Sequence, residues 1–373
     1  MAPEVEQIVS IVRCKRYHPE TVRNSFKELL EPWGGIGTFV KPGQKVLLKP
    51  NLLAAAKPEE AVTTHPVIMK AMAELVQGSG GRVLIGDSPG RDDAELTYRV
   101  TGMQAVAEET GAQLIKFDRF LQKDYDGIRK RKLELAAALE QVDLVINMAK
   151  LKTHPLTGLT GAVKNTYGCI VGPKKAKMHF EYPLPGDFSR LLIDVFMAVR
   201  PVLSVIDAVI AMEGTGPRRG KPRNTGLIMA SPDGFALDRT AAAVVGFKTE
   251  QVTTLAAAKE ESIPGMNLPE IKIRGLTLED SLIDHFDPGA STSGKLSRLV
   301  SRFPLAWVKG IIDRRRPFPR FDPQSCTGCG ICMEECPAQI ISLDGGIPDL
   351  ELDSCIRCYC CMEFCPQGAI DLR

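Results

Sequence analysis

Two stretches near the C-terminus carry the same pattern, CTGCGICMEECP at residues 326–337 and CIRCYCCMEFCP at residues 355–366. Each stretch reads C-x2-C-x2-C-x3-C-P, and an offset of 29 residues places Cys326 on Cys355 and Ile341 on Ile370. The two stretches are therefore copies of one unit. Their eight regularly spaced cysteines restrict what this end of the chain can bind.

This spacing is the one with which bacterial ferredoxins hold two [4Fe-4S] clusters, and the fourth cysteine of each run binds the cluster of the other run. For residues 321–373 we therefore predict a small α+β bacterial ferredoxin-like domain with two [4Fe-4S] clusters as cofactors. The proline after each run prevents a helix from continuing past the crossing ligand. The expected metal ligands are Cys326, Cys329, Cys332 and Cys365 for one cluster, and Cys355, Cys358, Cys361 and Cys336 for the other.

Other roles for these cysteines fit the pattern less well. Zinc sites use paired cysteine knuckles separated by a longer loop, without the C-x3-C-P ending. Disulfides need an oxidising compartment, and the first residues do not resemble a secretion signal. Cys360 is a ninth cysteine of the segment and could compete as a ligand, although a buried apolar role is favoured. Cys169 invites the same choice between a redox-active and a buried cysteine.

The composition is that of a globular protein with about two domains. The chain has 373 residues, of which 44% are hydrophobic and 25% are charged. No uninterrupted apolar stretch reaches the roughly 18 residues that a membrane span needs. We therefore expect a reducing cytoplasmic location, in which the clusters would be stable.

Charge is distributed unevenly along the chain. Residues 321–373 contain two basic and nine acidic residues, a net charge of −7, while the whole chain is at +2. Residues 295–320 contain eight basic residues and one acidic residue, interleaved with apolar ones. This pattern favours docking of the acidic segment within the chain, or a charged redox partner protein or low-potential electron donor. Membrane association is not expected, and no motif for reading nucleic acid is present.

The first three hundred residues alternate between strand-like and helix-like patterns. Such alternation predicts a layered α/β fold with a largely parallel sheet. The expected strands cover residues 7–13, 45–49, 82–86, 113–117, 142–148, 202–211, 227–230 and 271–273. The expected helices cover residues 18–30, 64–77, 93–110, 188–199, 235–245 and 250–259. The predicted organisation is a body over residues 1–294, a basic linker over 295–320 and the ferredoxin-like domain over 321–373.

Polar residues gather where the predicted strands end. Ligands of open α/β sheets bind outside the carboxyl ends of the strands, so these residues are candidates for one site. They predict a basic pocket for an anionic small-molecule substrate, such as a carboxylate or phosphate, although each lysine taken alone could be a solvated loop charge. The predicted substrate-binding residues are Lys49, Asn51, Lys150, Lys152, Lys164 and Asn165.

His65, His154 and Asp87 lie in the same segments and are the candidate catalytic residues. Histidine titrates near neutral pH and suits a proton donor, and a carboxylate suits acid-base work. Core or helix-start roles for the histidines, and strand-end capping for the aspartate, are the competing interpretations. The chain has neither a G-x-x-x-x-G-K-[ST] loop nor a G-x-G-x-x-G turn after a strand, so a nucleotide cofactor is not indicated.

Several of these segments resemble domain-of-unknown-function family 362, over roughly residues 46–246. Members of that family often carry a ferredoxin domain, as is expected here. The resemblance implies an uncharacterised iron-sulfur protein and supplies neither a substrate nor catalytic residues. The segments that carry it are Lys49-Pro50-Asn51, Thr64-His65-Pro66, Gly86-Asp87-Ser88-Pro89-Gly90, Lys150-Leu151-Lys152-Thr153-His154, Gly161-Ala162-Val163-Lys164-Asn165, and Asp207 to Pro217.

Two functions from different classes fit these observations. The first is an iron-sulfur oxidoreductase whose clusters relay low-potential electrons to an anionic substrate in the α/β domain. The second is a non-catalytic electron-transfer or assembly protein whose α/β body docks a partner. A dedicated basic pocket favours the first, because a pure carrier has no need of one.

Overall fold

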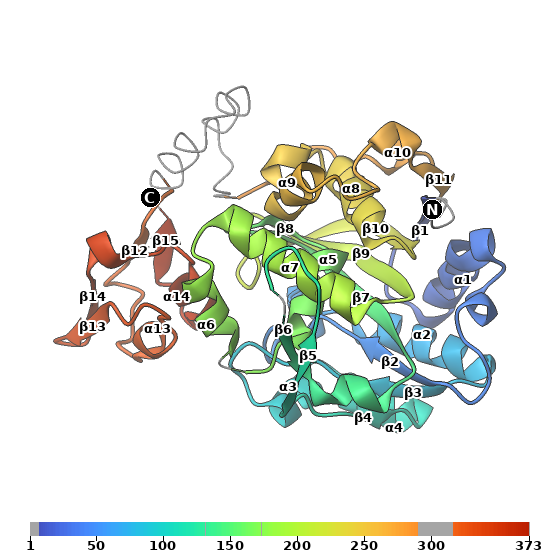
Figure 1. The fold of residues 1–373 in the computed structure, drawn as a ribbon, viewed down its shortest axis with the longest axis horizontal. Helices are drawn as coiled ribbons and strands as arrows, with labels where there is room; N and C mark the ends of the chain where they lie inside the picture. The colour runs from blue at the N-terminus through green and yellow to red at the C-terminus, as the bar shows by residue number, and fades with distance from the viewer. Residues whose placement is uncertain (1–6, 131, 173, 290–315, 373) are drawn as a thin grey trace.

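The protein consists of a large α/β body and a small C-terminal module (Figure 1). We call residues 7–289 the body and residues 316–372 the module. The predicted basic linker lies outside the described residues except for its last part, residues 316–320. The computed structural model describes residues 7–130, 132–172, 174–289 and 316–372.

Nine strands of the described residues form the central sheet of the body, in the order β11-β1-β10-β9-β7-β2-β3-β4, with β8 beside β7. Neighbours from β9 to β4 are parallel, whereas β10 is antiparallel to both of its neighbours. The predicted α/β fold with a largely parallel sheet is confirmed. The strands are β1 (Ile8–Arg13), β2 (Lys45–Lys49), β3 (Arg82–Ile85), β4 (Gln113–Leu114), β7 (Leu144–His154), β8 (Gly158–Thr160), β9 (Leu203–Glu213), β10 (Lys221–Ser231) and β11 (Lys272–Gly275).

Helices cover both faces of this sheet. On one face, α1, α2, α3 and α4 pack on apolar side chains such as Leu48 and Ile146, and on the other, α7 and α8 pack on side chains such as Val145 and Ala149. Every residue of β7 is buried, as expected for a central parallel strand covered on both sides. The helices of the body are α1 (Pro19–Leu30), α2 (Pro66–Gly78), α3 (Ala94–Val100), α4 (Met103–Thr110), α5 (Ala162–Asn165), α6 (Lys174–Glu181), α7 (Pro185–Val199), α8 (Gly234–Val244), α9 (Thr253–Glu260) and α10 (Leu278–Ser281).

Three local predictions need correction. The single helix expected over residues 93–110 is split into α3 and α4 at Gly102, whose φ of 79° lies in the left-handed region. The strand expected at residues 227–230 is the end of the longer β10, which begins at Lys221 and pairs with β9 along most of its length. A separate hairpin of β5 (Phe120–Asp124) and β6 (Lys132–Ala136) was not expected, because β5 is exposed throughout and carries no apolar alternation.

The module is built as two copies of one unit. Its helices are α13 (Ile331–Glu334) and α14 (Cys360–Phe364), and its strands β12 (Pro319–Phe321), β13 (Ile341–Asp344), β14 (Ile347–Leu350) and β15 (Ile370–Leu372) form two antiparallel pairs. Positive φ angles recur at the same offset of 29 residues as the cysteines, at Gly328 and Arg357, Gly330 and Tyr359, and Gln339 and Gly368. The sequence repeat is therefore also a repeat of backbone conformation.

The module lies against the edge of the sheet at which β2, β3, β7 and β9 end, which we call the carboxyl edge. Residues that follow β3 and β9 contact it: Arg91 binds Glu334 and Glu335, and Arg219 binds backbone carbonyls of the module. Apolar side chains of α7 and of the module belong to one continuous buried cluster. Figure 1 shows α14 on the side of the module that faces the body, beside α6.

Candidate functional site

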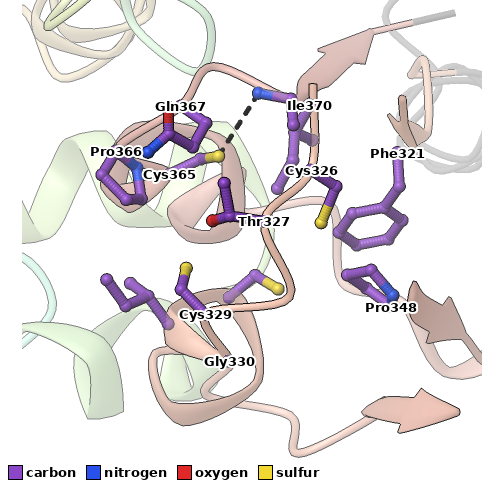
Figure 2. A pocket seen from close by; sticks show the side chains of 13 residues that line it. Phe321, Cys326, Thr327, Cys329, Gly330, Pro348, Cys365, Pro366, Gln367 and Ile370 are labelled. Atoms are coloured by element: carbon purple, nitrogen blue, oxygen red, sulfur yellow. Dashed lines mark hydrogen bonds between the residues drawn. The ribbon is translucent and has the colours of Figure 1, made fainter. Parts of the chain in front are cut away.

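Four cysteines of the module line one cavity. These are Cys326, Cys329, Cys332 and Cys365, the set predicted from the spacing for one cluster. Figure 2 shows the sulfur atoms of Cys326, Cys329 and Cys365 facing the same space. Cys365 belongs to the second cysteine run. It reaches this cavity because the two halves of the module are folded against each other.

A second cavity is lined by the other predicted set. Cys355, Cys358 and Cys361 of the second run meet Cys336 of the first run there, together with apolar side chains such as Ile341. The two cavities thus exchange their fourth cysteine, which is the exchange that the spacing predicts.

The chemistry of these cavities fits iron-sulfur clusters. Backbone N–H groups already point at sulfur: Gly328 N lies 3.4 Å from Cys326 Sγ, and Ala369 N lies 3.3 Å from Cys365 Sγ. Such N–H to sulfur hydrogen bonds stabilise the negative charge of a bound cluster and tune its potential. Within residues 7–130, 132–172, 174–289 and 316–372, no three His, Cys, Asp or Glu side chains are placed to hold a single metal ion. In an iron-sulfur cube each thiolate binds a different iron, so four cysteines around one cavity suit such a cluster.

The remaining cysteines of the sequence analysis are buried. Cys360 begins α14 and is 3% exposed, and it lines neither of the two cysteine cavities. Burial raises the pKa of Cys169 to about 12, so its thiol stays protonated and is a poor nucleophile. Cys169 thus has the environment of a small core residue, whereas the buried side chain of Cys360 is hydrogen-bonded to the proposed ligand Cys358.

Lys49 and Asp87 form a buried ion pair at the carboxyl edge. Lys49 Nζ lies 2.7 Å from Asp87 Oδ1, and both side chains are almost fully excluded from solvent. Asp87 also accepts a hydrogen bond from the backbone N–H of Leu52 at 2.8 Å. The pair joins the ends of β2 and β3, so Asp87 acts here as a strand-end anchor.

Lys150 makes a second buried pair, with Asp207 at 3.0 Å. The hydroxyl of Tyr17 donates to Asp207 at 2.8 Å and accepts from Lys150 at the same distance. The ring of His65 stacks on that of Tyr17, with centroids 3.5 Å apart, and its Nδ1 accepts the N–H of Val67 at the start of α2. Burial, opposed by the charge of Asp207, lowers the pKa of His65 to about 4, so its imidazole is neutral at pH 7.

Lys152 and the two asparagines are joined to the same edge. Lys152 donates to Asn51 Oδ1 at 2.8 Å and to the carbonyl of Val62 at 2.7 Å. Asn51 in turn donates to Asn165 at 2.9 Å. Burial, together with the charge of Lys164, lowers the pKa of Lys152 to about 7.

The lysines of the predicted basic pocket differ in their surroundings. The six residues of this pocket do gather at the carboxyl edge, but Lys49 and Lys150 are each neutralised by a buried carboxylate. An anion could bind either ammonium only by separating such a pair, which costs several kcal/mol. Lys164 differs from these two lysines, because the carboxylate with which it interacts, that of Glu363, belongs to the module.

Glu363 of α14 reaches from the module into the body. Its Oε2 lies 3.6 Å from Nε2 of His154, and its side chain is only 14% exposed. Burial alone would raise the pKa of Glu363, but the hydrogen bond and charge of His154 and the charge of Lys164 lower it to about 2. Burial, with the charge of Lys164, lowers the pKa of His154 to about 4. At neutral pH the ion facing the Glu363 carboxylate is thus Lys164, and His154 is a neutral neighbour.

Sequence reasoning did not find Tyr17, Glu363 or Arg219. Tyr17 lies outside the strand-end segments, between β1 and α1. Glu363 has the same repeat position as Glu334 and so carried no distinguishing signal. Arg219 was part of a glycine-containing segment that failed as a nucleotide motif, and its role appears only when the module is in place.

The family comparison agrees with this architecture. A model of the family "Domain of unknown function (DUF362)" matches residues 46–243, more than half of the chain. The chain belongs to this family. A 4Fe-4S dicluster domain model matches residues 318–366, so the chain also carries an iron-sulfur electron-transfer domain. Together the two matches give the fusion that the sequence resemblance predicted.

One relative of this DUF362 protein is a thylakoid-associated protein of Synechocystis sp.. The two are 37% identical over 250 residues, which cover 67% of this chain and 78% of the relative. In the described residues, no helix is long and apolar enough to cross a membrane.

Similar solved structures are distant. A lactate racemase apoprotein from Thermoanaerobacterium thermosaccharolyticum has 12% identity and a TM-score of 0.39, over 62% of this chain and 55% of that one. A Thermotoga maritima protein has 14% identity and a TM-score of 0.34, over 57% of this chain and 55% of that one. This chain thus spans little more than half the length of either structure.

Proposed function

We propose that this protein is an iron-sulfur oxidoreductase in which the module exchanges low-potential electrons with an anionic substrate held at the carboxyl edge of the body. Two [4Fe-4S] clusters, bound by the two sets of four cysteines, would supply one-electron transfer. The residues of the body would hold the substrate, exclude water and provide charge.

The observation that carries this proposal is the position of the module. Open α/β sheets bind ligands outside the carboxyl ends of their strands, particularly where neighbouring strands diverge. In this protein the same edge is covered by α14 and by Cys365, so a ligand there would lie next to a cluster. A carrier whose body served only as a support would not need its clusters against that edge.

The buried pairs serve this arrangement by fixing the edge. Lys49 with Asp87 joins β2 to β3, and Lys150 with Asp207 joins β7 to β9. Lys175 adds a bond from Nζ to the carbonyl of Pro89 at 3.0 Å and a short one to that of Ser88. The loop after β3 is thereby held rigid where Arg91 contacts the module, which keeps the distance between cluster and substrate constant.

The proposed partner is a low-potential redox protein, and the acidic module is the surface that it would approach. We propose the cytoplasm as the location of this protein, because a reducing compartment keeps iron-sulfur clusters stable. The name of the Synechocystis relative suggests a second location, at a membrane surface. Fractionation of cells expressing the tagged full chain distinguishes the two, because a cytoplasmic protein stays in the supernatant at low salt.

The second candidate function is a non-catalytic electron-transfer or assembly protein. It is favoured by the buried pairs of Lys49 and Lys150, which occupy two of the lysines expected to bind substrate. In that case the body would only position the clusters or dock a partner.

One experiment separates enzyme from carrier. Small molecules that copurify with anaerobically prepared protein would be identified by mass spectrometry, and their reduction or oxidation followed with a low-potential donor. Lys164→Ala should leave the iron content and cluster reduction intact. It should reduce turnover about ten- to a hundredfold, because the proposed charge-assisted contact between Lys164 and the substrate is lost. Lys177→Ala is the matched control, since Lys177 is 74% exposed on α6. Equal turnover by both variants and the wild type would favour the carrier.

A further inference from the structure

A cavity of about 250 Å³ lies where the body meets the module. One wall is the loop that follows β9, and the other is formed by α14 and the end of the module. The loop reaches this position through a cis peptide bond between Gly216 and Pro217. The lining residues are Thr215, Gly216, Pro217, Arg218, Arg219, Met362, Glu363, Gly368, Ile370 and Asp371.

The cavity adjoins one of the proposed clusters. Arg219 Nε lies 3.1 Å from the carbonyl oxygen of Cys365, and Nη2 lies 3.0 Å from it. Cys365 also lines the first cysteine cavity. Arg219 is therefore in direct contact with a residue of that proposed cluster site. A molecule in contact with Arg219 would therefore be one residue away from a proposed cluster ligand.

Two guanidinium groups give this cavity its positive charge. Arg219 donates to carbonyl oxygens of Cys365 and Pro366, which are neutral, so its charge is not cancelled by those bonds. Arg218 is 25% exposed, and its contact with the carboxylate of Asp92 is long, at 3.9 Å. An arginine in this state can still receive a bidentate carboxylate.

The acidic groups of the lining are engaged elsewhere or screened. The carboxylate of Glu363 lies against His154 and interacts with the charge of Lys164. Asp371 is exposed, so water screens its charge. The face of the cavity formed by the loop after β9 thus remains positive.

From this geometry we propose that the cavity is the binding site of a small carboxylate, with the guanidinium of Arg218 as its anchor and with Arg219, which binds the carbonyl oxygen of Cys365, beside it. The inference rests on the proposed redox function and gives it a substrate class. A volume of 250 Å³ lies below the roughly 300 to 1,000 Å³ of sites for larger ligands, so it selects acids of a few carbon atoms rather than nucleotides. The arginines after β9 are thereby proposed as anion-binding residues in addition to Lys164.

Malonate is the probe for this site because it is small, carries two carboxylates and is not readily reduced. Calorimetry with oxidised, cluster-loaded wild type should give saturable binding of one malonate per chain. Arg218→Gln should weaken the affinity about ten- to a hundredfold. Arg223→Gln is the matched control, since Arg223 is 39% exposed and also has its nearest carboxylate, Glu213, at 3.9 Å. It should change the affinity less than about twofold.

A second measurement locates the malonate without any variant. Reduced clusters are paramagnetic, so the relaxation of carbon-13-labelled malonate should accelerate severalfold in reduced wild type compared with oxidised wild type. Absence of binding, equal effects of Arg218→Gln and Arg223→Gln, or relaxation indifferent to reduction would each overturn the proposed site. Iron content and reduction by dithionite, measured on the same samples, report separately on the proposed redox function.

Discussion

Helices α13 and α14 occupy the same place in the two halves of the module, yet their surroundings differ. Met333 of α13 is 40% exposed, while Met362 at the equivalent position of α14 is 6% exposed. Glu334 makes an exposed ion pair with Arg91, and its counterpart Glu363 lies buried against His154. The first copy meets the body through the ion pairs of Glu334 and Glu335 with Arg91, whereas the second copy is buried against the body.

The comparison separates two kinds of constraint. Cysteine spacing and the positive φ angles are shared by both halves, so they belong to cluster binding. The residues between the cysteines differ because α14 is buried against the carboxyl edge, whereas α13 reaches it through ion pairs with Arg91. The two halves of the module thus share their cluster ligands but differ in their contacts with the body. Variants at equivalent positions should have similar effects at the cysteines and different effects at residues that contact the body.

The largest expected effect is at the crossing cysteines. Anaerobic wild type should contain about eight iron atoms and eight acid-labile sulfides per chain. Cys336→Ala should destroy the cluster of the second run, and Cys365→Ala that of the first run, each leaving about four iron atoms. Iron analysis and electron paramagnetic resonance of the reduced proteins would measure this.

A matched control comes from adjacent residues of α14. Cys361→Ala should lose a cluster, while Cys360→Ala should retain about eight iron atoms, because Cys360 lines neither cavity. Loss of iron from Cys360→Ala, or a protein with a single zinc or [2Fe-2S] centre, would contradict the assignment.

A smaller effect is expected from the two equivalent glutamates. Glu363→Gln removes a buried charge that faces Lys164 and should lower the free energy of unfolding by about 2 to 3 kcal/mol. Glu334→Gln removes an exposed ion pair and should cost less than about 1 kcal/mol. Thermal unfolding of the cluster-loaded proteins gives the comparison. Equal losses would mean that α14 is not docked in solution.

The pH dependence of stability should reveal the same asymmetry. The pKa of His154, about 6.5 in an unfolded chain, is lowered to about 4 in the folded protein by burial and by Lys164. The unfolded chain therefore takes up a proton below pH 6.5 and the folded protein does not, so stability falls as the pH decreases from 6.5 to 4.

At pH 5 this contribution amounts to about 2 kcal/mol, and it should be absent from His154→Gln. The measurement is the midpoint of unfolding at pH 7 and pH 5 for both proteins. Burial also lowers the pKa of His65 to about 4 and that of His179 to about 3, so the stability of the variant should still depend on pH, but less steeply. Identical slopes in the two proteins would refute a buried, neutral His154.

The smallest effects concern the turns shared by the two halves. Gln339 has a φ of 55° where the equivalent residue is Gly368, so Gln339→Gly should stabilise the module by up to about 1 kcal/mol. Gly330→Ala, at a φ of 77°, should cost about 1 kcal/mol. Denaturant titration measures the change in the free energy of unfolding for both variants. An increase in both would argue against the shared backbone conformation.

Local patterns in the sequence were enough for the layered fold and for the grouping of the cysteines. Apolar runs such as residues 142–148 predict a central strand, and the C-x2-C-x2-C-x3-C-P spacing predicts which cysteines surround each cavity. The apolar run is a local signal, and the cysteine spacing repeats the known geometry of bacterial ferredoxins. The ends of β7 and β10, by contrast, depend on the partner strands and were predicted too short.

The candidate site was only partly predictable, because its chemistry depends on pairing between distant segments. Lys150 reads as a free strand-end cation until Asp207 is placed beside it, and Glu363 reads as a surface charge until α14 is docked. No local property of the chain distinguishes Glu363 from Glu334. Only the arrangement of body and module does so.

Helix α14 contributes the proposed cluster ligand Cys361, and its Met362 and Glu363 are buried against the body. Loading of iron and docking of the module on the body should therefore be coupled. When iron is scarce, a newly made chain would present the apolar surface that α14 normally covers, and proteases and chaperones recognise such surface. The lifetime of this protein in a cell should consequently follow the iron supply.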